Sequence, residues 1–374
     1  MRRGCVQESR LKLSELDYHL PPERIAQHPL AERDSSRMLL LDRSTGAWED
    51  RRFRELPELV RGDELIVVNN ARVLPARLFG RRAGVRAEAP GRNNPARSEF
   101  LQAPIEVLLV RQVDPDVWEA LVRPGRKIPV GERILFGDGE LEASVEGRGE
   151  YGLRILRFTS KNNFQEALGR LGHIPLPPYI KRSDEPSDRQ RYQTVYAKEG
   201  SAVAAPTAGL HFTPDILNRL RSRGVEIVEI TLEVGLGTFE PIRSERIEEH
   251  RIHKEFYEIP KSTTAAVAQA RREKRKVLAV GTTVVRALED AAAKAPAAPE
   301  AAIPSGRAEA DIYLYPGKSF RVVDQLLTNF HLPQSSLLAM VAAFAGRENV
   351  LAAYRHAVEA EYRFYSYGDC MLIR

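Results

Sequence analysis

Two histidines lie in segments whose composition suits acid–base chemistry near neutral pH. His211 follows a run of small residues at 204–209 and precedes a predicted helix start at Thr213, while His331 lies in the turn 327–333 between a predicted strand and a predicted helix. A histidine in such a position can take up or donate a proton, because its ordinary pKa lies close to neutral pH. A structural turn whose histidine is satisfied by neighbouring groups is the more common arrangement, so the spacing alone favours the structural interpretation for both histidines.

Two turns rich in glycine and threonine could bring a ligand against bare backbone. The segment 233–241 contains a Gly-x-Gly pair, and the segment 280–286 runs from a predicted strand through small residues into a predicted helix. Free backbone N–H groups at such a helix start bind anions, and Arg286, about one turn further on, could reach a carboxylate or a phosphate. A lone Gly-x-Gly is weak evidence and fits a bulge or turn equally well, whereas the geometry of 280–286 slightly favours a ligand site.

Cations and aromatic rings alternate in parts of the chain in a way that suits RNA. Arginines crowd the region 72–86, and residues 179–196 interleave lysine and arginine with tyrosine. Single-stranded RNA is bound by stacking of its bases on such rings and by contacts to its phosphates. A further basic run at 271–276 is explained as well by compensation of a helix dipole on a solvated face. The candidates for RNA contact are Arg72, Arg77, Tyr179, Lys181, Arg182, Arg191 and Tyr192.

Composition limits the class of protein and its compartment. The chain has 374 residues, a net charge of +5 and no apolar run long enough to span a bilayer. The two cysteines, Cys5 and Cys370, make neither a disulfide framework nor a CxxC site, which fits a reducing cytoplasm. The pair His250 and His253 has a spacing that can hold a metal, but no third ligand is evident, so we predict no metal site. These features predict a cytoplasmic globular protein of two domains.

The elements that must position these residues fall into two groups. Between about 77 and 156, short β-rich runs are separated by turn residues without intervening helices. This pattern predicts a small sandwich or barrel. An α/β pattern flanks it on both sides, so we predict a mixed α/β main domain formed by 11–76 and 157–374, with an inserted small all-β, barrel-like domain at 77–156. The β-rich runs lie at 105–110, 118–122, 133–136, 141–145 and 153–158.

Within the main domain, buried strands are predicted at 65–68 and 277–280, because both are continuous apolar runs. The second of these leads into a helix that is expected to end at Asp290. A further strand is expected at 310–315. Two segments without any period are predicted as flexible loops, 84–104 and 291–306.

A series of short motifs runs along the chain in a fixed order: DYHLP at 17–21, RDSSR at 33–37, NNARVLPARL at 69–78, GHIPLPPYI at 172–180, RYQTVYA at 191–197, PTAGLHF at 206–212, GLGTF at 235–239, GTT at 281–283, YPG at 315–317, TNFHLP at 328–333 and RFYSYGD at 363–369. Each motif alone could recur by chance, but the ordered set is specific. It resembles the S-adenosylmethionine:tRNA ribosyltransferase-isomerase family of queuosine biosynthesis over about 13–373. The loops at 84–104 and 291–306 and the leading residues 1–10 are longer than the family's usual pattern.

The resemblance implies an enzyme that moves ribosyl carbons of S-adenosylmethionine, rearranged into an epoxycyclopentane ring, onto 7-aminomethyl-7-deazaguanine at the tRNA wobble position. Adenine and methionine are released, and the product is epoxyqueuosine in tRNA. S-adenosylmethionine is then a consumed cosubstrate, and neither a cofactor nor a metal is required. The expected partners are S-adenosylmethionine and tRNA, with no membrane, and a monomer is expected.

Such a reaction needs a base that removes a proton from the carbon beside the sulfonium, and an acid near the departing adenine. His211 is the first candidate for the base and His331 the second, while Glu233 or Asp311 could face the sulfonium or the acceptor amine. Arg286 would hold the donor carboxylate. The other candidates for S-adenosylmethionine binding are Thr207, Ala208, Gly209, Gly235, Gly237, Thr238, Gly281, Thr282, Thr283 and Asn329.

Functions of other classes remain open at this point. A non-catalytic RNA-binding protein would explain the basic and aromatic segments but would leave the ligand-type turns without a role. An S-adenosylmethionine-dependent tRNA methyltransferase would need a glycine-rich loop after its first strand and an acidic residue at the end of its second, which the sequence does not display. A hydrolase built on Thr207 and His211 is a weaker alternative, because no acid that could orient the histidine is evident.

Overall fold

A nine-stranded mixed sheet forms the centre of the larger part of the protein. The computed structural model describes residues 11–84, 103–125, 128–161, 163–235, 242, 244–295 and 303–374. The sheet is built from β1 (Arg37–Leu41), β2 (Trp48–Arg52), β3 (Leu65–Asn69), β12 (Glu226–Leu232), β13 (Glu255–Ile259), β14 (Val277–Val280), β15 (Gly306–Ala310), β16 (Gln325–Asn329) and β17 (Cys370–Ile373). Their order is β15-β13-β12-β3-β14-β16-β17-β1-β2, and the four strands from β12 to β16 run parallel to one another.

Helices cover both faces of this sheet, because the apolar side chains of its central strand β3 point alternately to one face and to the other. Leu65 and Val67 of β3 point into one core with apolar side chains of α6, α7, α8 and α9, whereas Ile66 and Val68 point into a second core with those of α1 and α5. A strand buried on both faces reads as a continuous apolar run, which is why β3 was predictable. The helices are α1 (Leu56–Leu59), α5 (Pro214–Ser222), α6 (Lys261–Arg272), α7 (Thr282–Lys294), α8 (Ser336–Ala345) and α9 (Arg347–Glu359).

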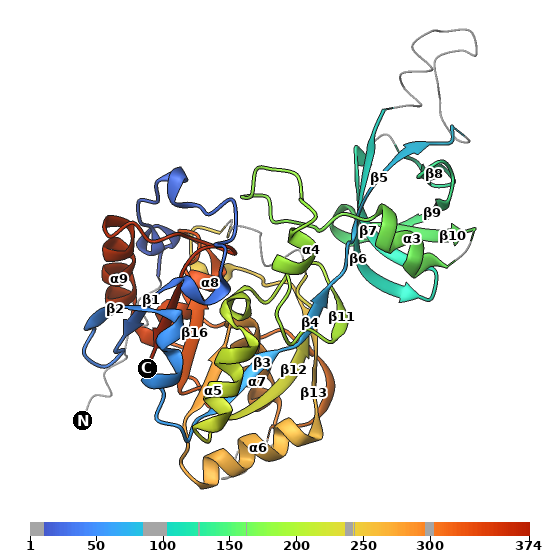
Figure 1. The fold of residues 1–374 in the computed structure, drawn as a ribbon. Helices are drawn as coiled ribbons and strands as arrows, with labels where there is room; N and C mark the ends of the chain where they lie inside the picture. The colour runs from blue at the N-terminus through green and yellow to red at the C-terminus, as the bar shows by residue number, and fades with distance from the viewer. Residues whose placement is uncertain are drawn as a thin grey trace, which may run out of the picture.

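A closed barrel stands apart from this sheet at one end of the molecule (Figure 1). Its strands are β5 (Arg77–Arg82), β6 (Ile105–Asp114), β7 (Val117–Arg123), β8 (Arg133–Phe136), β9 (Leu141–Arg148) and β10 (Arg154–Ser160). Helix α3 (Phe164–Leu171) packs Ala167 and Leu168 into the barrel core. The predicted fold class, a mixed α/β domain with an inserted barrel, is confirmed. The last barrel strand ends at Ser160, past the predicted boundary at 156.

Short elements connect the two parts. Strands β4 (Ala71–Val73) and β11 (Glu199–Ala202) pair in parallel, and the short helix α4 (Asp188–Arg191) lies in the segment that returns from the barrel. Within the described residues no single helix is both long and apolar enough to cross a membrane; α8 and α9 meet that length and composition only as a pair bent by 115°.

Two predictions around α7 are wrong. The helix does not end at Asp290 but continues to Lys294, so 291–294 are not part of a loop; alanine is the strongest helix former, and Ala291 is fully buried. The strand predicted at 310–315 instead spans 306–310 as β15. It ends there because the backbone N–H groups of Asp311 and Ile312 donate to the Asp290 carboxylate, at 3.1 and 3.2 Å, rather than to a neighbouring strand. Residues 85–102 and 296–302 of the predicted loops lie outside the described residues.

Candidate active site

A ligand-sized cavity lies where parallel strands of the main sheet end. It has a volume of about 690 Å³ and is lined by the turns that follow β14 and β16, by 204–208 after β11, and by Tyr365 and Ser366 just before β17. The carboxyl ends of β14 and β16 meet at one sheet edge because the two strands run parallel. Ligands of α/β proteins bind at this edge, and the volume suits a molecule the size of a nucleoside.

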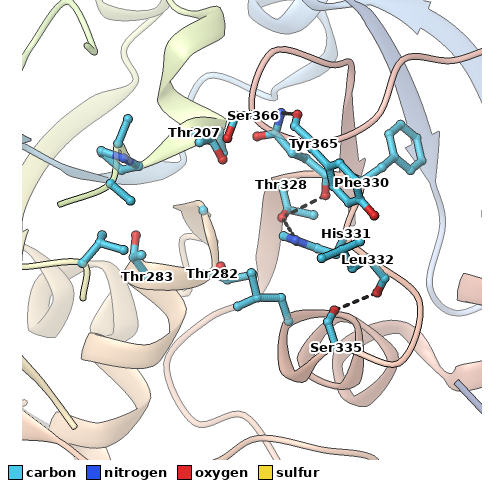
Figure 2. A pocket seen from close by; sticks show the side chains of 18 of the residues that line it. Thr207, Thr282, Thr283, Thr328, Phe330, His331, Leu332, Ser335, Tyr365 and Ser366 are labelled. Carbon is cyan, nitrogen blue, oxygen red and sulfur yellow. Dashed lines mark hydrogen bonds between the residues drawn. The ribbon is translucent and has the colours of Figure 1, made fainter. Parts of the chain in front are cut away.

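Figure 2 shows Thr282 and Thr283 on one side of this cavity and His331, Tyr365 and Ser366 on the other. The threonines form the first turn of α7, whose preceding residue Gly281 has φ of 93° and provides no side-chain cap. That conformation suits glycine, since it lies in the region that a Cβ atom disfavours. The uncapped backbone N–H groups of a helix start attract negative charge, so this wall suits an anionic part of a ligand.

Asn329 presents a buried acceptor to the cavity. Its Nδ2 group lies 3.0 Å from the carbonyl oxygen of Tyr365, 3.3 Å from that of Asp369 and 3.3 Å from Nε2 of His211, so its two N–H groups have three acceptors within reach when the proton of His211 is on Nδ1. These three acceptors fix which end of the amide carries the nitrogen. The Oδ1 atom has no partner although the residue is buried, and an unpaired buried acceptor is costly unless a ligand supplies a donor.

His211 supports Asn329 from behind the cavity wall rather than lining it. Its Nδ1 is 2.9 Å from Oγ of Ser36, its Nε2 accepts from Asn329, and its ring packs against Phe53 with centroids 5.3 Å apart. Burial, with the nearby Arg33 charge adding to it, lowers the pKa of His211 to about 3. The imidazole is therefore neutral at physiological pH, and both of its nitrogens are already engaged.

His331 does line the cavity. Its Nε2 is 2.7 Å from Oγ1 of Thr328, and that hydroxyl is placed to donate to the carbonyl oxygen of Asn329 at 3.3 Å. In the tautomer that carries its proton on Nε2, a lone pair lies on Nδ1, for which the described residues provide no partner. The backbone is held by hydrogen bonds with Tyr18 and Tyr354, and burial lowers the pKa of His331 to about 3.

Two tyrosines form an aromatic wall that the sequence did not single out as a pair. Tyr365 and Tyr179 pack with ring centroids 4.6 Å apart, and the Tyr179 hydroxyl bonds to Oγ of Ser366 at 2.6 Å. Tyr365 has a φ of 69°, which is rare for a tyrosine, and its buried hydroxyl has no partner. Aromatic faces attract cations, so this wall suits a positively charged sulfur.

Several residues predicted to bind S-adenosylmethionine meet in this cavity, and others do not. The cavity is lined by Thr207, Ala208, Gly281, Thr282, Thr283, Asn329 and His331 from these candidates. It is also lined by Tyr179, which was predicted to contact RNA. Residues not foreseen by the sequence reasoning are Ala204, Ala205, Pro206, Val234, Thr328, Phe330, Leu332, Ser335, Leu337, Tyr365 and Ser366. Phe330, Tyr365 and Ser366 lie inside motifs already noted, but no local pattern distinguished them as lining residues.

Among the described residues, the other acidic and glycine candidates do not line this cavity. Glu233 forms an ion pair with Arg307 at 3.5 Å, and Asp311 is exposed and lies 3.4 Å from Lys294. Gly209 is packed so tightly that a Cβ atom would lie 2.1 Å from the hydroxyl oxygen of Tyr196, which accounts for the glycine without a ligand. Gly235 donates its N–H to Oε1 of Glu255 at 3.0 Å. Gly237 and Thr238 lie outside the described residues.

Arg286 lines a neighbouring cavity of about 480 Å³ that shares Thr282 and Thr283 with the first. Its guanidinium is buried and lies 2.5 Å from a Glu255 carboxylate oxygen, and it also donates to the carbonyl oxygen of Ala310 at 3.0 Å. The cation that was predicted to hold the donor carboxylate is thus already paired within the protein.

The predicted RNA contacts are divided between surface and interior. Arg72 and Lys181 are exposed, whereas Arg77 and Arg182 form ion pairs with carboxylates 3.2 and 2.7 Å away. Tyr192 is fully buried, so its ring offers no face on which a base could stack. Arg191 is half-buried beside a second small cavity. Among the residues with described coordinates, no group of three or more His, Cys, Asp and Glu side chains is arranged to hold a metal ion.

Comparison with known proteins connects this site to a family. The chain matches the family described as queuosine biosynthesis protein over residues 13–373. It is 54% identical to the S-adenosylmethionine:tRNA ribosyltransferase-isomerase of Solibacter usitatus, a match covering 97% of this chain and 100% of that protein, and 49% identical to that of Moorella thermoacetica with the same coverage. Its sequence is 35% identical to that of S-adenosylmethionine tRNA ribosyltransferase from Thermotoga maritima, whose crystal structure matches this one with a TM-score of 0.51. The match covers 96% of this chain and 100% of that chain. The chain therefore belongs to the queuosine biosynthesis protein family, whose curated relatives are S-adenosylmethionine:tRNA ribosyltransferase-isomerases.

Proposed function

We propose that this protein transfers and isomerises the ribosyl group of S-adenosylmethionine onto 7-aminomethyl-7-deazaguanine at the wobble position of tRNA, with release of adenine and methionine. One observation carries the proposal. Motifs that are far apart in the sequence, at 206–212, 281–283, 328–333 and 363–369, all contribute to the walls of one cavity at the strand ends. S-adenosylmethionine is consumed as a cosubstrate, and no metal is assigned a role.

The walls of the cavity suit different parts of this donor. The faces of Tyr179 and Tyr365 suit the sulfonium, and the uncapped start of α7 suits the carboxylate of its methionine portion. The Oδ1 atom of Asn329 suits a donor such as the acceptor amine or the adenine amino group. Positioning of both reactants in one enclosed space supplies much of the rate enhancement of a two-substrate reaction.

His331 is proposed as the base that removes the proton beside the sulfonium. Its Nδ1 lone pair is free of described partners, whereas both nitrogens of His211 are engaged behind the wall. The proton moves from carbon to Nδ1, and adenine departs with the electrons of its bond to the ribosyl group and takes up a proton. The neutral acceptor amine bonds to a ribosyl carbon and gives up a proton, and the bond between carbon and sulfur then breaks, with its electrons on the sulfur of the departing methionine. His211 is proposed to act through Asn329 as a positioning residue, which revises the order of the two candidates.

The proposal extends to partners and place of action. A protein that modifies tRNA works where tRNA is found, so we propose a cytoplasmic enzyme that acts as a monomer on a tRNA carrying the deazaguanine base. Arg72 and Lys181, which are exposed, are proposed to contact its phosphates.

A chromatographic assay of the products tests the proposal. The protein is incubated with S-adenosylmethionine, with and without tRNA that carries 7-aminomethyl-7-deazaguanine. Release of adenine and methionine only with that tRNA is the expected result. S-adenosylhomocysteine among the products would identify a methyltransferase instead, and binding of the tRNA without any product would leave an RNA-binding protein.

A further inference from the structure

A second, smaller cavity of about 260 Å³ lies at the segment 366–368, next to Tyr365 and Ser366, which line the main cavity. Ser366 lines both cavities, while Tyr367 and Gly368 face only the smaller one. Arg33 and Arg191 enter it from two other segments. The two cavities thus share Ser366 as a lining residue.

The two arginines of the small cavity have no carboxylate partners in the described part of the chain. Arg33 donates to the backbone carbonyl oxygens of Leu210 and Gln190, at 3.1 and 2.7 Å. Arg191 donates to the carbonyl oxygen of Ala31 at 2.7 Å, and its buried Nε has no acceptor. Carbonyl oxygens orient a guanidinium but do not neutralise it, so two positive charges face the same small space.

The charges also act on each other. Burial lowers the pKa of Arg33 to about 10, and the charge of Arg191 adds to this effect. A further cation, Arg363, is close enough to lower the pKa of His211 together with Arg33. Like charges gathered in a partly buried space are destabilising unless an anion joins them.

The acids nearby are already occupied. Asp369 is buried and accepts the backbone N–H groups of Arg37 and Arg363, each at 2.8 Å. Asp188 accepts two hydrogen bonds from Arg182, at 2.7 and 2.9 Å. Glu32 stands at the rim of the cavity, but its carboxylate is exposed and lies 3.4 Å from Arg54. Arg33 and Arg191 therefore remain without a carboxylate partner in the described part of the chain, whereas the charge of Asp369 acts on Arg363.

We infer that this cavity binds a phosphodiester group of the tRNA next to the nucleotide whose base occupies the main cavity. The inference rests on the proposed function, because it takes the base in the main cavity to belong to RNA. A base that reacts in a pocket must leave its stack, and the phosphate attached to its ribose then lies beside that pocket. Two guanidinium groups that line one small space can bind the oxygens of a phosphate.

Neutral phosphate analogues test this inference without any change to the protein. An anticodon stem-loop RNA is prepared with a methylphosphonate at the phosphate on the 5′ or the 3′ side of the wobble nucleotide, and its Kd is compared with that of the unmodified RNA. We expect one of the two positions to weaken binding about 10-fold or more, as for loss of a charge-assisted hydrogen bond. Equal affinity for all three RNAs would overturn the inference.

A variant assigns the effect to this cavity. Arg191→Gln should weaken RNA binding to a similar degree and reduce the slope of log Kd against log salt concentration by about 0.7, the value for one phosphate on a single strand. The methylphosphonate should then have no further effect, since both changes remove the same contact. Arg272→Gln removes an equal charge from the exposed end of α6 and should leave the response to the methylphosphonate unchanged.

Three results would contradict the inference. The losses from Arg191→Gln and from the methylphosphonate could add in full, the Arg272→Gln control could abolish the response, or Arg191→Gln could raise the KM for S-adenosylmethionine while RNA affinity stays unchanged. The last result would make the cavity a site for the donor carboxylate. Arg191→Lys should recover part of the RNA affinity, which separates loss of charge from loss of folding. Adenine release is measured separately, so a protein that binds RNA through this phosphate yet releases no adenine would refute the proposed function alone.

Discussion

Replacement of His331 by glutamine tests the assignment of the base most directly. The amide of glutamine can still meet Oγ1 of Thr328, which His331 Nε2 contacts at 2.7 Å, but it provides no nitrogen lone pair that can take up a proton. Turnover should therefore fall while the binding of both substrates is retained. The equivalent change at His211, whose nitrogens are engaged by Ser36 and Asn329, should have the smaller effect on turnover.

The expected size follows from the roles of the two residues. A positioned general base contributes about 10²–10⁴-fold to a rate, which corresponds to about 2.7–5.4 kcal/mol, so His331→Gln should lower kcat by that factor. His211→Gln disturbs only one of the three acceptors that orient the Asn329 amide. A single neutral hydrogen bond is worth about 1 kcal/mol, so a loss of roughly 5–10-fold is expected there.

The assay is single-turnover adenine release with saturating tRNA, because it reports the chemical step rather than product release. Its pH profile provides a second test: His331 has a pKa of about 3 and is neutral throughout pH 5–8, so it should contribute no acidic limb in that range. Near-normal single-turnover rates in a folded His331→Gln protein would refute its role as the base. A limb close to pH 6.5 that disappears in this variant would refute the lowered pKa.

Two further predictions concern stability. Lowering the pH from 7 to 5 should reduce the free energy of unfolding by about 4 kcal/mol through His211 and His331 together: below about pH 6.5 the unfolded chain binds a proton at each, while the folded pKa values near 3 keep both neutral. Burial raises the pKa of Asp369, so protonation of this carboxyl group opposes part of the loss of stability. Urea titrations at the two pH values measure the net change in the free energy of unfolding. Equal stability at pH 7 and pH 5 would contradict the prediction. Glu255→Gln should cost about 3–5 kcal/mol in the same titration, because it leaves the buried Arg286 charge unpaired. Unchanged stability would show that the carbonyl contacts of Arg286 suffice.

Local patterns in the sequence account for much of the fold. The barrel strands were predictable because residues alternate between its core and solvent, as along β9, where Leu141, Ala143 and Val145 are buried. The start of α5 was predictable because Thr213 accepts a hydrogen bond from the N–H of Ile216, the usual role of an N-cap threonine. Both signals operate within a few residues of chain, so they need no knowledge of the rest of the molecule.

Elements that depend on distant partners were not predictable in the same way. Strand β1 pairs in parallel with β17, at the other end of the chain, and no local pattern indicates that pairing. The end of β15 depends on Asp290 in α7, which captures the next backbone N–H groups. Correct placement of these elements requires the sheet order, which is a property of the whole chain.

The candidate site likewise has features that local sequence indicated and features that depend on distant partners. Residue types and their order identified the segments that could carry chemistry: the turns containing Gly281, Asn329 and His331 were recognised in this way, and they meet in one cavity. The position and the hydrogen-bond partners of each residue in that cavity, by contrast, depend on the fold. It set His211 behind the wall and His331 in it, and it engaged Arg286 with Glu255. The physical reason is that burial, charge and unpaired hydrogen-bonding groups depend on neighbours brought together by folding, not on neighbours in sequence.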